Sequence, residues 1–230
     1  MKAGGPEWIL ERIAASYDRT IVEGMKGVDL YKLLPERITG HPAYAHLRHG
    51  DCSSGNPAIR DFLSPVAGDR FLDLGCCMNL VNYRFDEWPS VYFGVDISGE
   101  NIEALRLHVT RRNIMVGGLH QERIDRLPFA DGYFRIAACV GVLEYYPMEY
   151  AQTVLREARR VLEKGGRFYA DIPNTGHPGI AAMRMIEEHM GRPIMLGIAG
   201  FKFEKLLDKL FDVAGVDASR VMTGYFLRAV

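Results

Sequence analysis

The chain of 230 residues has few cysteines, no long apolar run and almost no net charge. Its four cysteines fit neither a disulfide framework nor a CxxC zinc motif, so reduced thiols are expected at Cys52, Cys76, Cys77 and Cys139. The longest run of apolar residues and glycines, 136–143, falls far short of the roughly 18 residues that cross a bilayer. Residues 1–10 include Glu7 and lack the apolar core of a signal peptide. The sequence therefore predicts a cytoplasmic protein with no membrane partner.

Basic and acidic residues balance, with 28 Lys and Arg against 29 Asp and Glu, which leaves a formal net charge of −1. Binding to a polyanion usually shows as a basic excess, so this balance argues against a nucleic-acid partner. Hydrophobic residues make up 48% of the chain, enough apolar surface to offset chain entropy, which excludes a disordered protein. We expect a monomer or homodimer.

Two regions of the chain differ in their pattern of apolar, polar and turn-forming residues. Residues 1–65 predict a cap: a helix over 6–21 is followed by a loop-rich stretch punctuated by glycine and proline. Residues 66–230 alternate short apolar runs with amphipathic stretches, the pattern of strands and crossover helices in a parallel α/β sheet. Within this second domain, residues 174–200 read as a lid insertion. No repeat or low-complexity tract divides the chain further.

Five apolar runs predict parallel strands, at 70–74, 92–96, 114–116, 135–140 and 167–172. Val154, Leu155, Ala158 and Val161 form one apolar stripe of a helix that we expect to stop at the glycines 165–166. After a further helix near 203–211, the runs 219–223 and 225–230 flank Gly224 and predict an antiparallel hairpin at the sheet edge.

The segment FLDLGCCMNL runs an apolar strand into Asp73 and Gly75. In a doubly wound sheet the turn after the first strand is where a ligand meets exposed backbone N–H groups. The dinucleotide fingerprint GxGxxG is not met, because its second and third glycines are replaced by Cys77 and Leu80. About 20 residues on, a second strand ends in Asp96, at the spacing of an acid that accepts the hydroxyls of a ribose. Together these features indicate a nucleoside ligand.

Four ordered segments resemble the class I S-adenosylmethionine-dependent methyltransferases, in particular the small-molecule, type 11-like branch: DLGCCMN (73–79), GVDIS (94–98), RIDRLPFADGYF (123–134) and CVGVLEYYP (139–147). The resemblance covers roughly residues 56–230. It implies a Rossmann-like, doubly wound α/β sheet of seven strands, mostly parallel, with an antiparallel C-terminal hairpin and an N-terminal cap. It also implies that S-adenosylmethionine is the cofactor and that methyl transfer is a direct in-line displacement on a small-molecule acceptor.

The resemblance also implies the cofactor-binding residues. The methionine part is expected near Asp73, Gly75, Cys76, Cys77 and Asn79, the ribose at Asp96 and Ile97, the adenine beside Glu122, Arg123 and Ile124, and the sulfonium over Val140 and Gly141. Tyr17, in the segment SYDR, resembles an N-terminal aromatic that closes over the cofactor.

Three positions depart from the family pattern. Cys77 stands where a second glycine is usual, and Tyr145 stands where a histidine is usual. Arg123 replaces an aspartate that accepts from the adenine amino group, and arginine is a donor only. Gln121, Glu122 or the backbone of Ile124 could take over that contact.

A general base, if the acceptor needs one, could be Tyr145, His46, His49 or His177. His41, His46 and His49 near Cys52 lack close ligand pairs, so no metal site is expected. Acceptor contacts are expected from the N-terminal region, from 144–146 and from the 174–200 insertion. Two alternatives stay open: an RNA or protein methyltransferase, which needs a basic groove, and a non-catalytic relative that keeps the fold as a binding subunit.

Overall fold

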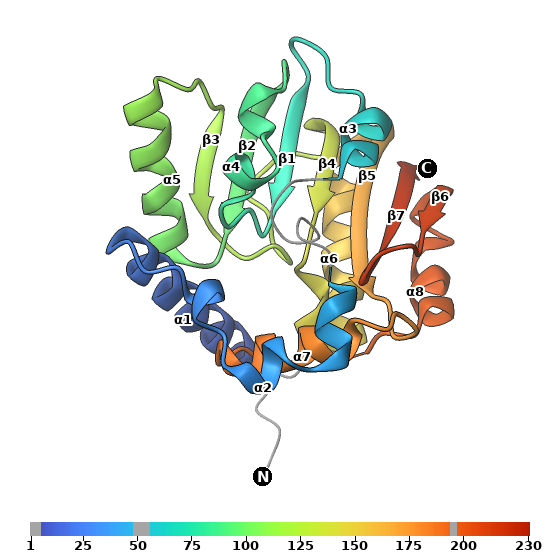
Figure 1. Ribbon diagram of the computed structural model, residues 1–230. Coiled ribbons are helices and arrows are strands. Elements are labelled where there is room, and N and C mark those ends of the chain that lie inside the picture. Colours follow the sequence, from blue (N-terminus) through green and yellow to red (C-terminus); the bar gives the residue numbers. More distant parts are fainter. Residues whose placement is uncertain (1–5, 48–55, 194–196) are drawn as a thin grey trace.

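The computed structural model describes residues 6–47, 56–193 and 197–230, which form helices around one seven-stranded sheet (Figure 1). The strand order is β3-β2-β1-β4-β5-β7-β6. Strands β3, β2, β1, β4 and β5 pair in parallel, whereas β7 is antiparallel to both β5 and β6. The strands are β1 Arg70–Leu74, β2 Val91–Asp96, β3 Gly118–Gln121, β4 Phe134–Cys139, β5 Leu162–Pro173, β6 Phe211–Asp217 and β7 Met222–Ala229. The predicted doubly wound sheet with an antiparallel C-terminal pair is confirmed.

Alternate residues of the central strands enter two separate cores. Phe71 packs with α3, α4 and α5 on one face of the sheet, whereas Leu72 packs with α6 and α8 on the other. Both faces are covered, which explains why β1 and β4 read as continuous apolar runs. The helices are α1 Pro6–Met25, α2 Glu36–Thr39, α3 Pro57–Leu63, α4 Asn79–Asn82, α5 Gly99–Arg112, α6 Met148–Val161, α7 Ile180–His189 and α8 Gly200–Leu207, with short 3-10 turns η1 Leu30–Leu33, η2 Pro42–His46, η3 Phe85–Glu87 and η4 Leu143–Tyr145.

The prediction of a strand at 114–116 is wrong, because the third strand is β3. Helix α5 ends in a left-handed residue, Asn113, and the next amide, of Ile114, still donates to the carbonyl of Val109. Residues 113–117 therefore form the connection between α5 and β3, and the pairing of β3 with β2 begins at Gly118.

Two boundaries in the C-terminal half also differ from the prediction. Helix α6 ends at Val161, and β5 begins at Leu162 instead of after the glycine pair. The hairpin is formed by β6 and β7, so Gly224 lies inside β7 and not in the turn. A Cβ at Gly224 would stand 2.5 Å from the hydroxyl oxygen of Tyr169, so this glycine makes room for a ring on β5.

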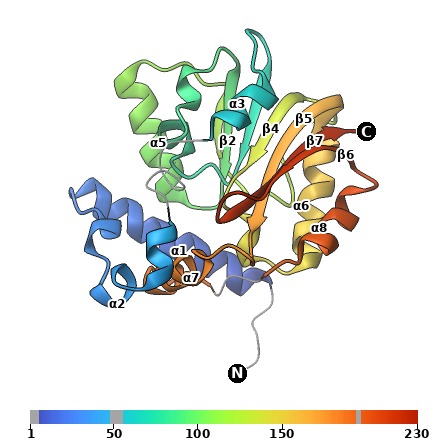
Figure 2. The ribbon, with the colours of Figure 1, turned by 45° about the vertical axis from the view of Figure 1, so that its right-hand side comes forward.

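Helices α1, α2 and α7 lie together at one end of the sheet (Figures 1 and 2). This is the end at which β1, β2 and β4 terminate in the segments that carry the predicted cofactor residues. The N-terminal region and the 174–200 segment, far apart in sequence, therefore cover the same edge. The division of the chain at residue 65 stays a prediction. Over the described ranges, no helix has both the length and the hydropathy that a bilayer span requires.

Candidate functional site

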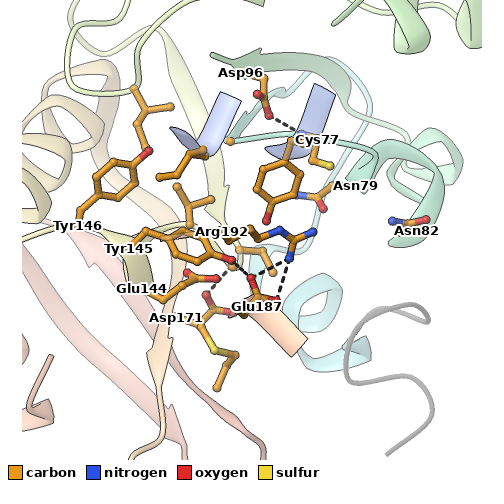
Figure 3. A pocket seen from close by; sticks show the side chains of 18 of the residues that line it. Cys77, Asn79, Asn82, Asp96, Glu144, Tyr145, Tyr146, Asp171, Glu187 and Arg192 are labelled. Atoms are coloured by element: carbon orange, nitrogen blue, oxygen red, sulfur yellow. Dashed lines mark hydrogen bonds and ion pairs between the residues drawn. The ribbon is translucent and has the colours of Figure 1, made fainter. Parts of the chain in front are cut away.

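A cavity of about 270 Å³ opens at the carboxyl ends of the central strands, beneath α1, η1 and α7 (Figure 3). Ligand sites in α/β sheets occur at this edge, and small-molecule pockets begin at about 300 Å³. Eleven residues predicted to hold the cofactor, and one candidate base, line it: Tyr17, Gly75, Cys77, Asn79, Asp96, Ile97, Glu122, Arg123, Ile124, Val140 and Gly141, and Tyr145.

The turn after β1 approaches the cavity closely at Gly75. Its φ is +68°, and a Cβ there would stand 2.5 Å from Cγ2 of Val142. The amide of Gly75 donates to the carbonyl of Val95 at 2.8 Å, which ties the turn to β2. Only glycine therefore fits this position without strain.

Asp96 joins the tip of β2 to this turn. One carboxylate oxygen accepts from the amide of Cys77 at 2.7 Å, and the other accepts from the amide of Ser98 at 2.8 Å. Burial raises the pKa of Asp96, and these two hydrogen bonds oppose the rise. Cys77 itself has a φ of +37°, and burial raises the pKa of its thiol to about 12, so it stays protonated. A carboxylate oriented by two backbone amides retains lone pairs for further donors.

Two predicted residues lie under the turn instead of in the cavity wall. Asp73 is fully buried and accepts from the hydroxyl of Tyr92 at 2.8 Å and from Nδ2 of Asn79 at 3.3 Å. Burial raises the pKa of Asp73 to about 7. Cys76 is equally buried, within the core on the α5 side of the sheet. Both residues support the turn from below.

At the end of the cavity near β3, Arg123 holds α1 in place. Its guanidinium donates to both carboxylate oxygens of Asp125, at 2.9 and 2.7 Å, and to Glu7 of α1 at 2.6 Å. The pKa of Arg123 is raised, chiefly by these hydrogen bonds. Arg123 therefore links α1 to the segment after β3 through ion pairs, beside the region where the resemblance places the adenine. The adjacent wall is apolar, formed by Leu10, Ile13, Ile97 and Ile124.

The floor of the cavity carries two buried carboxyl groups. Asp171, on β5, accepts from the amide of Gly141 at 2.8 Å, and burial raises its pKa to about 7. Glu144, in η4, is 2% exposed, and its Oε1 lies 3.8 Å from where a Cβ on Gly141 would stand. Its Oε2 has no hydrogen-bond partner among the described residues. Burial raises the pKa of Glu144 well above its ordinary value, and the neighbouring Asp171 adds to the rise.

Arg192 and Glu187 form a buried ion pair that also lines the cavity. Nη1 of Arg192 lies 2.8 Å from each oxygen of Glu187, and Nη2 donates to the hydroxyl of Tyr31 at 2.7 Å. The hydroxyl of Tyr145 donates to Glu187 (Figure 3). The Arg192 guanidinium lies 4.2 Å from the ring centre of Tyr17. The sequence analysis missed this pair. Glu187 and Arg192 lie five residues apart in a methionine-rich insertion that also carries Arg184 and Glu188, so the sequence does not single out this pair.

The candidate bases that the structure describes lie in different surroundings. The hydroxyl of Tyr145 is committed to Glu187, and burial raises its pKa well above the ordinary value. His46 is exposed at the end of η2, Nδ1 of His177 accepts from the amide of Gly179, and neither lines the cavity. His49 lies outside the described residues. His41 caps η2 by accepting from the amide of Ala43.

Comparison with known proteins gives a consistent family signal. Residues 72–170 match the family model described as a methyltransferase domain. A ubiquinone biosynthesis O-methyltransferase of Xanthomonas oryzae pv. oryzae is 25% identical over 150 residues, which cover 64% of this chain and 62% of the relative. The enzyme of the same name from Xylella fastidiosa is 29% identical over 122 residues, covering 52% of this chain and 49% of the relative. The match thus spans less than two thirds of the length of these relatives.

Solved structures share the fold at low sequence identity. The 1,6-didemethyltoxoflavin-N1-methyltransferase of Burkholderia thailandensis, solved with 1,6-didemethyltoxoflavin and S-adenosylhomocysteine, superposes with a TM-score of 0.67 at 13% identity, covering 100% of this chain and 92% of that one. The PH0226 protein of Pyrococcus horikoshii gives a TM-score of 0.64 at 17% identity, covering 76% and 87% of the two chains.

Proposed function

We propose that this chain, which belongs to the class I S-adenosylmethionine-dependent methyltransferases, transfers a methyl group to a hydroxyl or amino group of a small molecule. The predicted family is confirmed by the domain match at 72–170 and by the seven-stranded topology. The predicted cofactor, S-adenosylmethionine, follows from that membership. The acceptor class and the in-line course of the transfer are part of the proposal.

The observation that carries the proposal is the shape of one cavity at the carboxyl edge of the sheet. Gly75 offers a close backbone approach, and Asp96 offers oriented carboxylate oxygens for a ribose. The apolar wall at Ile97 and Ile124 suits a flat base. The other end of the same cavity is lined by Tyr169, Met183, Ile186 and Met222, whose largely apolar surfaces suit an apolar or planar acceptor. The chemistry of the lining therefore fits the cofactor at one end and such an acceptor at the other.

When bound, S-adenosylmethionine supplies a methyl group on a positively charged sulfur. The residues of this chain have three tasks. The walls from α1 and α7 exclude water, and the turn at Gly75 together with Asp96 orients the cofactor. Oε2 of Glu144, which the described residues leave without a partner, can accept the proton that the acceptor hydroxyl or amine loses.

A small acceptor is favoured over RNA because Arg123 and Arg192, which line the cavity, are already paired with the carboxylates of Asp125 and Glu187. Two arginines of α6 are also engaged: Arg160 pairs with Glu157 at 2.7 Å and Asp131 at 2.8 Å, and Arg159 donates to the carbonyl of Leu162. The names of the relatives, which cite O- and N-methylation of small molecules, support the same choice. A cytoplasmic location and a monomeric or homodimeric state remain predictions.

The proposed function is tested by ligand binding and then by transfer. S-adenosylmethionine and S-adenosylhomocysteine, each at a hundred times its Kd, are expected to stabilise the protein by about 2.7 kcal/mol, a rise in Tm of several degrees. NAD, the control, is expected to leave the Tm unchanged. Methyl-labelled cofactor is then offered with pooled small hydroxy and amino compounds, with total RNA and with total protein. Label in RNA or protein contradicts the small-molecule proposal, and the absence of any Tm shift favours a non-catalytic relative.

Asp96→Ala is expected to weaken binding of S-adenosylhomocysteine by about 1–3 kcal/mol, a rise in Kd of about 5- to 150-fold, because the ribose loses charge-assisted hydrogen bonds. Isothermal calorimetry measures the Kd directly. The exposed Asp61 of α3 provides the control, since Asp61→Ala removes a carboxylate that does not line the cavity. Equal affinity in Asp96→Ala and wild type would remove Asp96 from the cofactor site.

A further inference from the structure

Arg192 is a buried cation with an unused donor in the cavity wall. The residue is 4% exposed and lines the cavity. Its Nε has no hydrogen-bond partner within the described part of the chain, although Nη1 and Nη2 are both engaged. A guanidinium has five N–H donors in one plane, and a buried donor of this kind is normally satisfied by protein, water or ligand. The unused donor therefore points to an acceptor group on a ligand.

The position of Arg192 identifies which ligand can reach it. Figure 3 shows the guanidinium between Glu187 and the turn that carries Cys77 and Asn79. The ring of Tyr17, from α1, lies against the guanidinium. The positive charge of Arg192 is also among the influences that lower the pKa of Cys77, so its field reaches the turn. The turn is where the proposed function places the methionine part of the cofactor.

Neighbouring segments hold Arg192 in this place before any ligand binds. Its backbone amide donates to the carbonyl of Glu187 at 3.0 Å. From α1, Nε of Arg12 donates to the carbonyl of Gly191 at 3.2 Å, and Nη2 of Arg19 donates to the carbonyl of Met190. A cation fixed in this way loses little freedom when an anion binds it.

Building on the proposed function, we propose that Arg192 binds the carboxylate of the methionine part of S-adenosylmethionine through its unused Nε donor. A carboxylate is the planar anion that a guanidinium recognises best, and it is the anionic group of the cofactor. Glu187 neutralises the charge of Arg192 in the absence of ligand. The lid insertion thus contributes a cofactor contact as well as a cover, which the sequence motifs do not indicate.

The test compares ligands with and without the carboxylate. S-adenosylhomocysteine carries it, and 5′-methylthioadenosine lacks the whole amino acid part. Decarboxylated S-adenosylmethionine lacks the carboxylate but keeps the ammonium and the sulfonium. In calorimetry, Arg192→Gln is expected to raise the Kd of S-adenosylhomocysteine about 10- to 100-fold. The Kd values of the two ligands without a carboxylate are expected to change less than about threefold.

Glu187→Gln is the matched control, because it breaks the same ion pair but leaves the cation. If Arg192 only supports the fold, the two variants weaken S-adenosylhomocysteine alike. If Arg192 binds the carboxylate, Glu187→Gln binds S-adenosylhomocysteine as well as wild type or more tightly, since a competing anion has gone. Arg192→Gln leaves Glu187 buried and unpaired, which can prevent folding. The double variant Glu187→Gln/Arg192→Gln avoids that charge and is compared with Glu187→Gln.

The outcomes separate the inference from the proposed function. If wild type binds neither S-adenosylhomocysteine nor 5′-methylthioadenosine, the proposed function fails and the inference fails with it. If wild type prefers S-adenosylhomocysteine and the Arg192 variants keep that preference, the inference alone is overturned. Loss of the preference in the Arg192 variants, with retained affinity for 5′-methylthioadenosine, supports it.

Discussion

Glu144→Gln is expected to lower kcat for methyl transfer by about 10²- to 10⁴-fold, the range that proton transfer by a positioned side chain contributes. The variant keeps the size and hydrogen-bonding shape of Glu144 but cannot accept a proton as a carboxylate does. The acceptor is the compound that the labelled-methyl screen identifies. The Kd of S-adenosylhomocysteine is expected to stay at its wild-type value, because the residue acts on the acceptor.

The pH dependence gives a second test of Glu144. Burial is the main cause of its raised pKa, and the charged groups that face it come from three neighbouring elements: Asp171 on β5, Glu187 on α7 and Arg192 after α7. Asp171 and Glu187 raise the pKa further, and Arg192 lowers it. Because only the ionised form accepts a proton, kcat is expected to rise with pH as Glu144 loses its proton, and Glu144→Gln should lack that rise.

The exposed Glu149 of α6 serves as the control for Glu144. Glu149→Gln makes the same chemical change five residues away and is expected to keep wild-type kcat and pH profile. A Glu144→Gln enzyme with wild-type kcat would show that the acceptor proton leaves by another route. It would also show that the unpartnered Oε2 has no part in the transfer.

Gly75→Ala is expected to lower the free energy of unfolding by about 2–5 kcal/mol and to weaken S-adenosylhomocysteine at least tenfold. Two separate costs add. An alanine at φ +68° adopts the left-handed region, which costs about 1–2 kcal/mol, and its Cβ meets Cγ2 of Val142 at 2.5 Å. Denaturant unfolding measures the first effect and calorimetry the second.

Gly68→Ala separates the two costs. Gly68 has a φ of +90° with nothing within 4 Å of an added Cβ, so its substitution carries only the backbone cost of about 1–2 kcal/mol. Adding Val142→Ala to Gly75→Ala removes the clashing methyl group and is expected to restore part of the stability. If Gly75→Ala and Gly68→Ala lose equal stability, the contact with Val142 is relieved by a small shift of the turn.

The order and type of the central elements could be predicted from the sequence because both faces of β1, β2, β4 and β5 are covered. Burial on both faces demands continuous apolar runs, and these are visible in the chain. The edge strands carry less of that signal. Strand β3 has no fully buried residue, and the burial of β6 is confined mostly to Phe211. Where these two strands begin therefore depends on where the preceding helices, α5 and α8, end and on the path of the chain after them.

The residues of the candidate site also differ in whether the sequence alone predicts their role. Gly75 and Asp96 could be predicted because they lie at the ends of strands that pair directly, β1 and β2, so their separation in sequence implies their proximity in space. Arg123 could be recognised as a departure from the family pattern. Its partner Glu7 is 116 residues away, and no local pattern shows that this arginine holds α1.

What the sequence determined by itself was the fold class, from local periodicity, and the family and cofactor class, from the resemblance of ordered segments between residues 73 and 147. It also predicted a ligand site at the carboxyl edge of the sheet, because the segments that carry these residues follow strands. Only the tertiary structure decided which polar groups face the cavity. The tertiary structure places Asp73 and Cys76 beneath the turn after β1. It also leaves Oε2 of Glu144 without a partner among the described residues and packs Arg192 of the insertion against Tyr17 of α1. Such contacts join segments up to 175 residues apart, counted from 17 to 192, and depend on packing that no local pattern encodes.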